Sequence, residues 1–89
     1  MKITLDISMY PLDADYKPPI KAFVRQLREY GQLETVTNQM STQVCGDFDA
    51  VMAAVNACMK QTMADHDKVV FVTKCLNGDL EISRSPRID

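Results

Sequence analysis

Apolar residues in this chain change between the spacing of a strand and the spacing of a helix, and the order of these changes limits the possible folds. The first residues, "ITLDISM", alternate between apolar and polar side chains, as in a strand with one buried face. Residues 18–30 carry apolar side chains at helical spacing after a Pro-Pro pair that suits a helix start, and Gly31 is placed to end this helix. Leu33–Asn38 and Ser41–Gly46 are short and rich in β-branched residues, which predicts two strands joined by a hairpin.

The second half of the chain repeats the change from helix to strand. Asp47 is placed to cap a second amphipathic helix, which fades near "ADHD". Lys68–Leu76 is the last long strand. The Asn77-Gly78 pair that follows is typical of a type I′ turn, which leaves open a short C-terminal edge strand over residues 79–83.

The resulting order of elements is βαββαβ. Right-handed crossovers place four strands in one antiparallel sheet with two helices on one face, which is the ferredoxin-like sandwich of the α+β class. The chain of 89 residues is long enough for one domain. We expect this domain over residues 1–83 and a flexible tail over residues 84–89.

The open face of such a sheet predicts self-association. In the last strand, Val69 and Phe71 face one side, whereas Val70 and Val72 face the other. A strand that is apolar on both sides needs cover on both sides. A second copy of the chain is the simplest cover, so we expect a homodimer or a homotetramer.

Composition argues against several kinds of partner. The net charge of −2 and the pI of about 5.2 indicate no basic stripe for a phosphate backbone, so we do not expect nucleic acid as a partner. Wholly apolar runs such as Val69–Val72 are far shorter than a membrane span, and the N-terminus has the pattern of a strand and not of a signal peptide. The 3 cysteines are widely spaced, which favours free thiols in a reducing compartment. We expect a cytoplasmic protein without membrane contacts.

Residues that could support catalysis are sparse. The only histidine, His66, lies at the end of the second predicted helix, where a cationic side chain is favourable, and we expect no role for it as a general base. The sequence has no cluster of metal ligands, no glycine-rich phosphate loop and no isolated pair of carboxylates. We therefore expect no enzyme activity, no metal and no cofactor.

Polar side chains crowd the stretch "TNQMSTQVCGD", residues 37–47. Serine, threonine and asparagine are common in turns, so an ordinary hairpin is one interpretation. The other interpretation is a binding pocket, because spare donors and acceptors beside the apolar side chains of Met40, Phe23 or Met9 would suit a flat heteroaromatic ligand.

Three stretches of the chain resemble the small thiamine-binding, YkoF-like family: "SMYPL", "YKPPIKAFVRQLREYG" and "TNQMSTQVCGDFDAVMAAV". The resemblance covers roughly residues 2–80. It implies a non-enzymatic domain that binds thiamine or its hydroxymethylpyrimidine moiety, with a link to thiamine salvage or transport. It also implies that open sheet faces pair into dimers or dimers of dimers. Two other functions stay open: a regulatory module for another small metabolite, and a structural oligomer without a ligand.

The same resemblance implies a set of ligand-binding candidates, which are Asp6, Tyr10, Phe23, Asn38, Met40, Ser41 and Thr42. Asn38, Ser41 and Thr42 would make polar contacts to an aminopyrimidine. Met40, together with Tyr10 or Phe23, would form walls for the ring. Asp6 would accept a hydrogen bond from the exocyclic amine or face solvent. No matching residue would hold a pyrophosphate, which favours free thiamine over its diphosphate.

Overall fold

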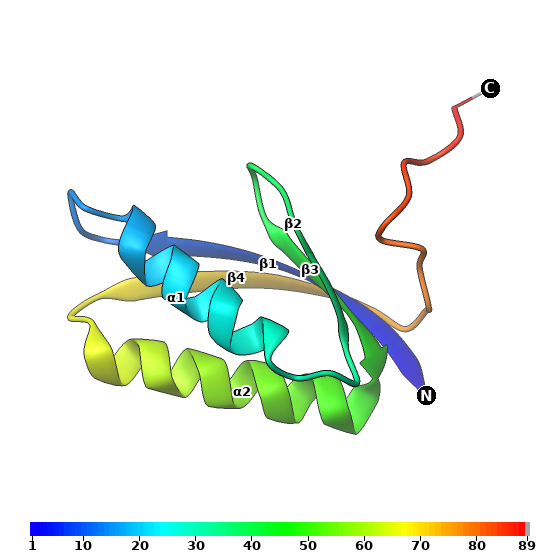
Figure 1. Cartoon of the computed structure of the whole chain (residues 1–89), viewed down its shortest axis with the longest axis horizontal. Helices are drawn as coiled ribbons and strands as arrows, with labels where there is room; N and C mark the ends of the chain where they lie inside the picture. Colours follow the sequence, from blue (N-terminus) through cyan, green and yellow to red (C-terminus); the bar gives the residue numbers. More distant parts are fainter. Residues whose placement is uncertain (89) are drawn as a thin grey trace.

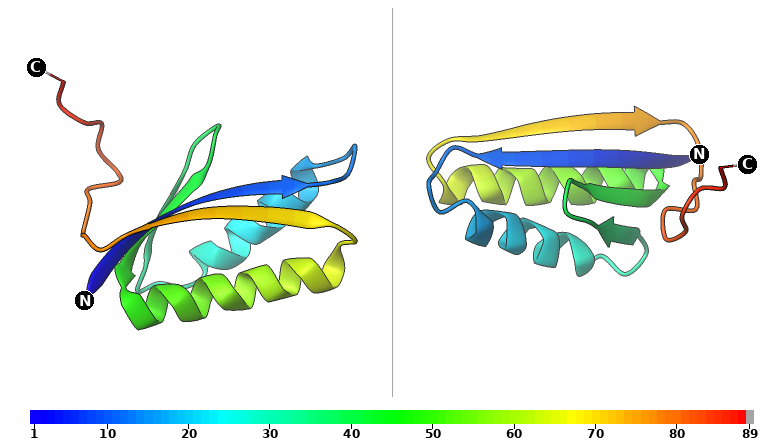
Figure 2. Two further views of the ribbon diagram at one scale, coloured as in Figure 1. Left: turned by 180° about the vertical axis from the view of Figure 1, so that it is seen from behind. Right: turned by 90° about the horizontal axis from the view of Figure 1, so that it is seen from above.

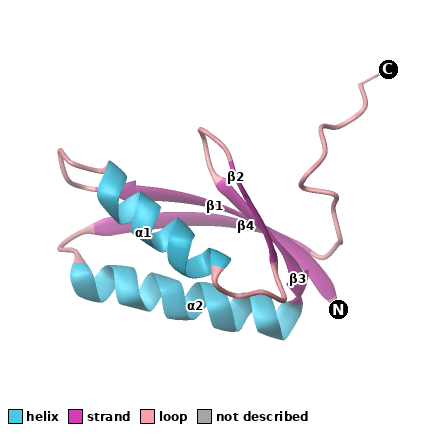
Figure 3. Ribbon diagram, viewed as in Figure 1, coloured by secondary structure: helices cyan, strands magenta, loops and turns pink. Residues whose placement is uncertain are grey.

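The computed structural model describes residues 1–88 and has the predicted βαββαβ order. Its elements are β1 (Lys2–Pro11), α1 (Lys17–Arg28), β2 (Glu34–Thr37), β3 (Thr42–Asp47), α2 (Phe48–Asp65) and β4 (Val69–Leu76). The strands form one 4-stranded antiparallel sheet in the order β2-β3-β1-β4. Both helices cover the same face of this sheet (Figure 1; Figure 3). The predicted α+β, ferredoxin-like fold is confirmed.

The core lies between β1 and the helices, because the alternation of β1 turns its apolar side chains to one side. Ile3, Leu5 and Ile7 are at most 3% exposed and form one cluster with Phe23 of α1 and Val51 of α2. Burial of each such aliphatic side chain contributes about 1.5–3 kcal/mol. Figure 2 shows β1 between β4 and β3, with the helices behind the sheet. The polar residues of β1 therefore lie on the open face.

Helix α1 begins as predicted but ends earlier. Pro18 and Pro19 lie in its first turn, where a missing N–H is harmless. Glu29 closes the last turn by donating its N–H to the Gln26 carbonyl at 3.2 Å. Gly31 was predicted as the cap, but it lies beyond the helix and has no positive φ, so a left-handed glycine cap is not formed.

Helix α2 has an unexpected partner at its start. Asp47 occupies the N-cap position as predicted, but its side chain makes no capping hydrogen bond. The Phe48 N–H donates instead to the Met1 carbonyl at 2.8 Å, and the Asp47 carboxylate lies 3.4 Å from the Met1 ammonium group. The first residue of the chain thus satisfies one of the free N–H groups at the start of the helix.

The C-terminal segment does not form the additional edge strand, since residues 79–88 contain no strand. Neither Asn77 nor Gly78 has the positive φ that a type I′ turn requires. The segment instead crosses one end of the open face. There the Thr4 hydroxyl donates to the Gly78 carbonyl at 2.8 Å and accepts from the Leu80 N–H at 3.2 Å. Figure 1 shows this segment leaving β4 beside the start of β1.

The predicted tail begins at Arg84, whose side chain pairs with Glu81 at 3.1 Å. Its last residue, Asp89, lies outside the described residues. The division into a domain over residues 1–83 and a flexible tail over residues 84–89 stays a prediction.

The other end of the open face is uncovered in the single chain. Val69 and Phe71 are half-buried on the helix side, and the Phe71 ring centroid lies 5.1 Å from that of Phe23. Val70 and Val72 face the opposite way and are 44% and 52% exposed. Strand β4 is therefore apolar on both sides, as predicted.

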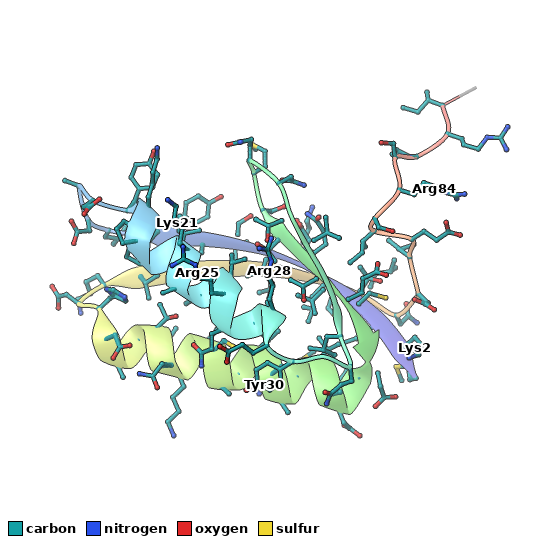
Figure 4. The ribbon with its side chains drawn as sticks, in the orientation of Figure 1. Lys2, Lys21, Arg25, Arg28, Tyr30 and Arg84 are labelled. Carbon is teal, nitrogen blue, oxygen red and sulfur yellow. The ribbon has the colours of Figure 1, made fainter. Side chains whose placement is uncertain are left out.

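Three basic residues lie together on helix α1, although the net charge of the chain is negative. Lys21, Arg25 and Arg28 follow one another at helical spacing along the exposed side of α1 (Figure 4). None of the three forms an ion pair with a carboxylate among residues 1–88. Net charge does not show this group of three cations, because it is summed over the whole chain. The absence of a nucleic-acid partner stays a prediction.

Candidate ligand-binding site

A pocket of about 90 Å³ lies beneath the tip of the β2–β3 hairpin, against α1 and β1. The hairpin tip projects beyond both helices (Figure 1). The apolar residues that line this hairpin pocket are Ile7, Met9, Ile20, Phe23, Val24 and Met40. The polar residues that line it are Thr37, Asn38, Gln39, Ser41 and Thr42. Apolar walls with a few polar groups on one side are typical of small-molecule sites.

The Asn38 side chain closes the hairpin. Its Oδ1 accepts from the backbone N–H groups of Met40 at 2.9 Å and Ser41 at 3.0 Å. The backbone N–H of Asn38 donates to the Ser41 carbonyl, also at 3.0 Å. Asparagine favours turns because its side chain can make such bonds to the following backbone. Asn38 is therefore a turn residue, and its Nδ2 group is the part of the side chain left for a ligand.

Thr37 and Thr42 place two hydroxyl groups on the helix side of the hairpin. They are direct partners in the β2–β3 register, and their Oγ atoms are 3.1 Å apart. Thr42 is buried. A hydroxyl can both donate and accept, so this pair can satisfy itself or offer one donor and one acceptor to a bound molecule.

Ser41 borders the hairpin pocket, but its hydroxyl is directed to the open face of the sheet. Its Oγ donates to Asp6 Oδ1 at 2.7 Å. Gln43 Nε2 donates to the same carboxylate oxygen at 2.9 Å and to Ser41 Oγ at 2.8 Å. Lys74 Nζ lies 3.7 Å from Asp6 Oδ2. The hydrogen bonds from Gln43 and Ser41, and then the charge of Lys74, hold the pKa of Asp6 below its ordinary value.

The structure brings most of the predicted site residues together. Those that line the hairpin pocket are Phe23, Asn38, Met40, Ser41 and Thr42. Asp6 lies on the opposite face of the sheet, where it pairs with Lys74. Tyr10 is 54% exposed near the end of β1, opposite Val70. Neither Asp6 nor Tyr10 lines the hairpin pocket.

Ile7, Ile20 and Val24 of this lining were not predicted from the sequence, and Thr37 and Gln39 were included in the polar stretch but not selected as ligand-binding candidates. Two signals could have identified some of them. Thr37 is the nearest partner of Thr42 across a hairpin, so both hydroxyls face the same side. Ile20 precedes Phe23 by one helical turn and therefore shares its face.

The other reactive side chains lie outside the hairpin pocket. His66 ends α2, where its backbone N–H donates to the Thr62 carbonyl at 3.1 Å. Cys45 and Cys58 are buried free thiols, and burial is the main cause that raises the pKa of each. Within residues 1–88, no three His, Cys, Asp or Glu side chains are grouped as a metal ion would need. No described helix combines the length and the apolar character of a transmembrane segment.

Several solved structures share this architecture. A hypothetical protein from Methanocaldococcus jannaschii is 26% identical, with a TM-score of 0.76 over 88% of this chain and 81% of that one. A candidate thiamine biosynthesis/salvage protein from Thermotoga maritima is 17% identical, with a TM-score of 0.76 over 97% of this chain and 90% of that one. A protein from Streptococcus pneumoniae is 20% identical, with a TM-score of 0.70 over 90% of each chain. At these identities, the likeness to the second and third structures shows the fold alone.

Comparison of the sequence with protein families is more specific than the structural similarity. The search among curated proteins found no match. The family described as "Thiamine-binding protein" matches residues 5–77, which include most of β1, the hairpin, both helices and all of β4. The chain therefore belongs to the thiamine-binding protein family.

Proposed function

We propose that this protein binds thiamine or its hydroxymethylpyrimidine moiety, catalyses no reaction, and acts in thiamine salvage or transport. Membership of the thiamine-binding family supports the class of ligand. The observation that carries the site is the hairpin pocket, where Phe23 and Met40 border the hydroxyl pair of Thr37 and Thr42. An aminopyrimidine needs apolar contacts on the faces of its ring, and it needs donors and acceptors along its edge.

The volume of the hairpin pocket favours the entry of a single ring. About 90 Å³ is well below the range of about 300–1,000 Å³ that is typical of sites enclosing a whole drug-sized ligand. We therefore infer that the pyrimidine ring enters and that the thiazolium part of thiamine stays at the mouth. Met40 is 86% exposed at this mouth, and its flexible side chain can fold over a bound ring.

We also propose that two copies associate through the uncovered end of the open face, as a homodimer or within a homotetramer. Tyr10, Val70 and Val72 form an exposed apolar patch there, and such patches are typical of interaction sites. The buried free thiols of Cys45 and Cys58 suit a cytoplasmic location.

Calorimetric titration tests the ligand and the pocket together. We expect hydroxymethylpyrimidine and thiamine to bind, and thiamine diphosphate to bind no more tightly than thiamine. Thr42→Val keeps the shape of the side chain and deletes one hydroxyl of the pair. It should weaken binding by about 1–3 kcal/mol, or about five- to 150-fold in Kd, because a buried polar atom is left unpaired.

Thr73→Val is the matched control, because it makes the same chemical change on β4, at an exposed position that does not line the hairpin pocket. It should leave the affinity unchanged. Absence of binding by both compounds to the folded wild type would overturn the proposed ligand. Equal affinities of wild type and Thr42→Val would place the site elsewhere.

A further inference from the structure

A second pocket, of about 300 Å³, lies on the open face of the sheet. It is bordered by β1, β3, β4 and the C-terminal segment. The lining residues that matter here are Asp6, Gln43, Lys74, Leu76, Leu80 and Ile82. This open-face pocket reaches the lower end of the range for small-molecule sites, about 300–1,000 Å³, which the hairpin pocket does not.

Hydrogen bonds hold the C-terminal wall of this pocket in place. The Thr4 hydroxyl binds the backbone of Gly78 and Leu80, and the Cys45 thiol donates to Asp79 Oδ1 at 2.9 Å. Thr4 and Cys45 are 5% and 6% exposed, although both belong to the open face. The wall is therefore packed on the sheet and is a defined part of the fold.

The floor of the open-face pocket carries one charge of each sign. Asp6 and Lys74 are direct partners in the β1–β4 register, with Nζ 3.7 Å from Oδ2. Ser41 and Gln43 both donate to the other carboxylate oxygen, Oδ1, so Asp6 is held in place. The Lys74 side chain is 82% exposed and can move. An exposed ion pair contributes only about 0–1 kcal/mol, so a ligand can separate the two groups at little cost.

A pair of opposite charges selects a ligand that also carries both. A simple anion is attracted by Lys74 but repelled by Asp6. A simple cation is attracted by Asp6 but repelled by Lys74. A small zwitterion gains from both groups. The side of the pocket beyond the charges is apolar, because Leu76, Leu80 and Ile82 gather there, which favours an aliphatic substituent on the zwitterion.

We propose that the open-face pocket binds an aliphatic α-amino acid. Its ammonium group would contact Asp6, its carboxylate would contact Lys74, and its side chain would pack against Leu76, Leu80 and Ile82. This inference does not rest on thiamine binding, since none of these residues lines the hairpin pocket.

The pocket adjoins the apolar patch assigned to self-association, and the two extend toward opposite ends of the open face. In the β1–β4 register, Thr4 pairs with Leu76 at the pocket end, whereas Tyr10 pairs with Val70 at the patch end. Val72 of the patch pairs with Ser8, and the next pair on the same face is Asp6–Lys74, so a second copy seated on the patch would lie beside the pocket.

Titration with matched probes tests the two charges of the ligand. L-leucine, L-isoleucine, L-valine and L-methionine are titrated into the full chain and followed by calorimetry or by amide shifts in NMR. We expect at least one to bind with a Kd on the order of 1 mM or tighter, the range for a ligand of this size. 3-Methylbutylamine lacks the carboxylate of leucine, and 4-methylpentanoate lacks its ammonium group. Each should bind about tenfold more weakly or worse than leucine, because one contact to a charged group is lost.

Variants then locate the site. Lys74→Gln should weaken amino-acid binding about tenfold or more, and Leu80→Ala should weaken it as well. Lys60→Gln on the exposed side of α2 is the control and should bind as wild type does. All variants are checked for an unchanged circular-dichroism spectrum.

The proposal is overturned if none of the four amino acids binds the folded protein, if the analogues bind as well as leucine, or if Lys74→Gln has no effect. Parallel titration with thiamine distinguishes a failure of amino-acid binding from a failure of the proposed thiamine binding. Lys74→Gln should leave thiamine binding intact, and Thr42→Val should leave amino-acid binding intact, so either site can fail without the other.

Discussion

The Ser41 hydroxyl donates a 2.7 Å hydrogen bond to the Asp6 carboxylate and so ties the tip of the β2–β3 hairpin to the central strand. Ser41 borders the hairpin pocket, whereas Asp6 borders the pocket on the open face. The contact therefore joins the two pockets through one side-chain pair. The Ser41 hydroxyl points away from the hairpin pocket, so we assign it a role in orienting the hairpin.

Ser41→Ala should lower the free energy of unfolding by about 0.5–1.5 kcal/mol, the usual net contribution of one hydrogen bond. Gln43 still donates to Asp6 in this variant, so the carboxylate keeps a partner. Urea denaturation of wild type and variant measures the difference. Ser8→Ala is the control, since Ser8 lies on the same face of β1 and borders neither pocket. Equal stability of wild type and Ser41→Ala would show that the hydrogen bond does not hold the hairpin.

The charge of Asp6 should make stability depend on pH in the acid range. Its pKa is lowered in the folded protein by hydrogen bonds from Gln43 and Ser41 and by the charge of Lys74. The folded state therefore binds fewer protons than the unfolded state there. The stabilisation is fully present above the ordinary value of 3.8 and is lost as pH falls through the lower folded pKa.

Asp6→Asn should remove this part of the pH dependence. Urea unfolding at several pH values between about 2.5 and 5 measures the slope of stability against pH. The slope should become flatter in Asp6→Asn, whereas Asp67→Asn, at an exposed position after α2, should keep the slope of wild type. An unchanged slope in Asp6→Asn would mean that another group dominates the acid response.

The elements of this fold could be predicted because their signals are local. The alternation of Ile3, Leu5 and Ile7 predicts a strand without knowledge of its partner, and the structure buries all three. Errors arose where a distant residue contacts a group that the local sequence assigns to a neighbour. At the start of α2 the Asp47 side chain was predicted as a cap, but its carboxylate lies 3.4 Å from the Met1 ammonium group and makes no capping hydrogen bond.

The candidate site was harder to predict because its contacts cross the sheet. Ser41 meets Asp6 only through the β1–β3 register, and a shift of one residue would turn the two side chains to opposite faces. The turn after β4 was also mispredicted because of a contact with a residue distant in the sequence. Asn77-Gly78 favours a hairpin locally, but the Thr4 hydroxyl binds Gly78 and Leu80 and draws the chain across the open face.

The cysteines should differ strongly in reactivity. Cys45 and Cys58 are buried and burial raises the pKa of both thiols, whereas Cys75 is exposed on β4. The thiolate is the reactive form, so iodoacetamide at neutral pH should modify Cys75 first. Mass spectrometry should show one rapid addition to the native protein, which Cys75→Ser removes, and the remaining additions only in denaturant. Rapid modification of Cys45 would contradict the packing of the C-terminal segment over this thiol.

Self-association should depend on the apolar patch at the uncovered end of the open face. Val72 is 52% exposed on this face and lies opposite Ser8 in the β1–β4 register. Val72→Lys places a charge in the proposed interface, where burial of an unpaired charge is strongly unfavourable. Sedimentation should give a dimer or tetramer for wild type at micromolar concentration and the 10.0 kDa monomer for Val72→Lys.

The neighbouring residue supplies the matched control. Thr73 is exposed and points to the opposite side of β4, so Thr73→Lys adds the same charge to the same strand without entering the patch. It should sediment as wild type does. A monomeric wild type would contradict the proposed self-association. Dissociation by both variants would place the contact at the free edge of β4, because a lysine on either side of an edge strand disfavours pairing with another strand.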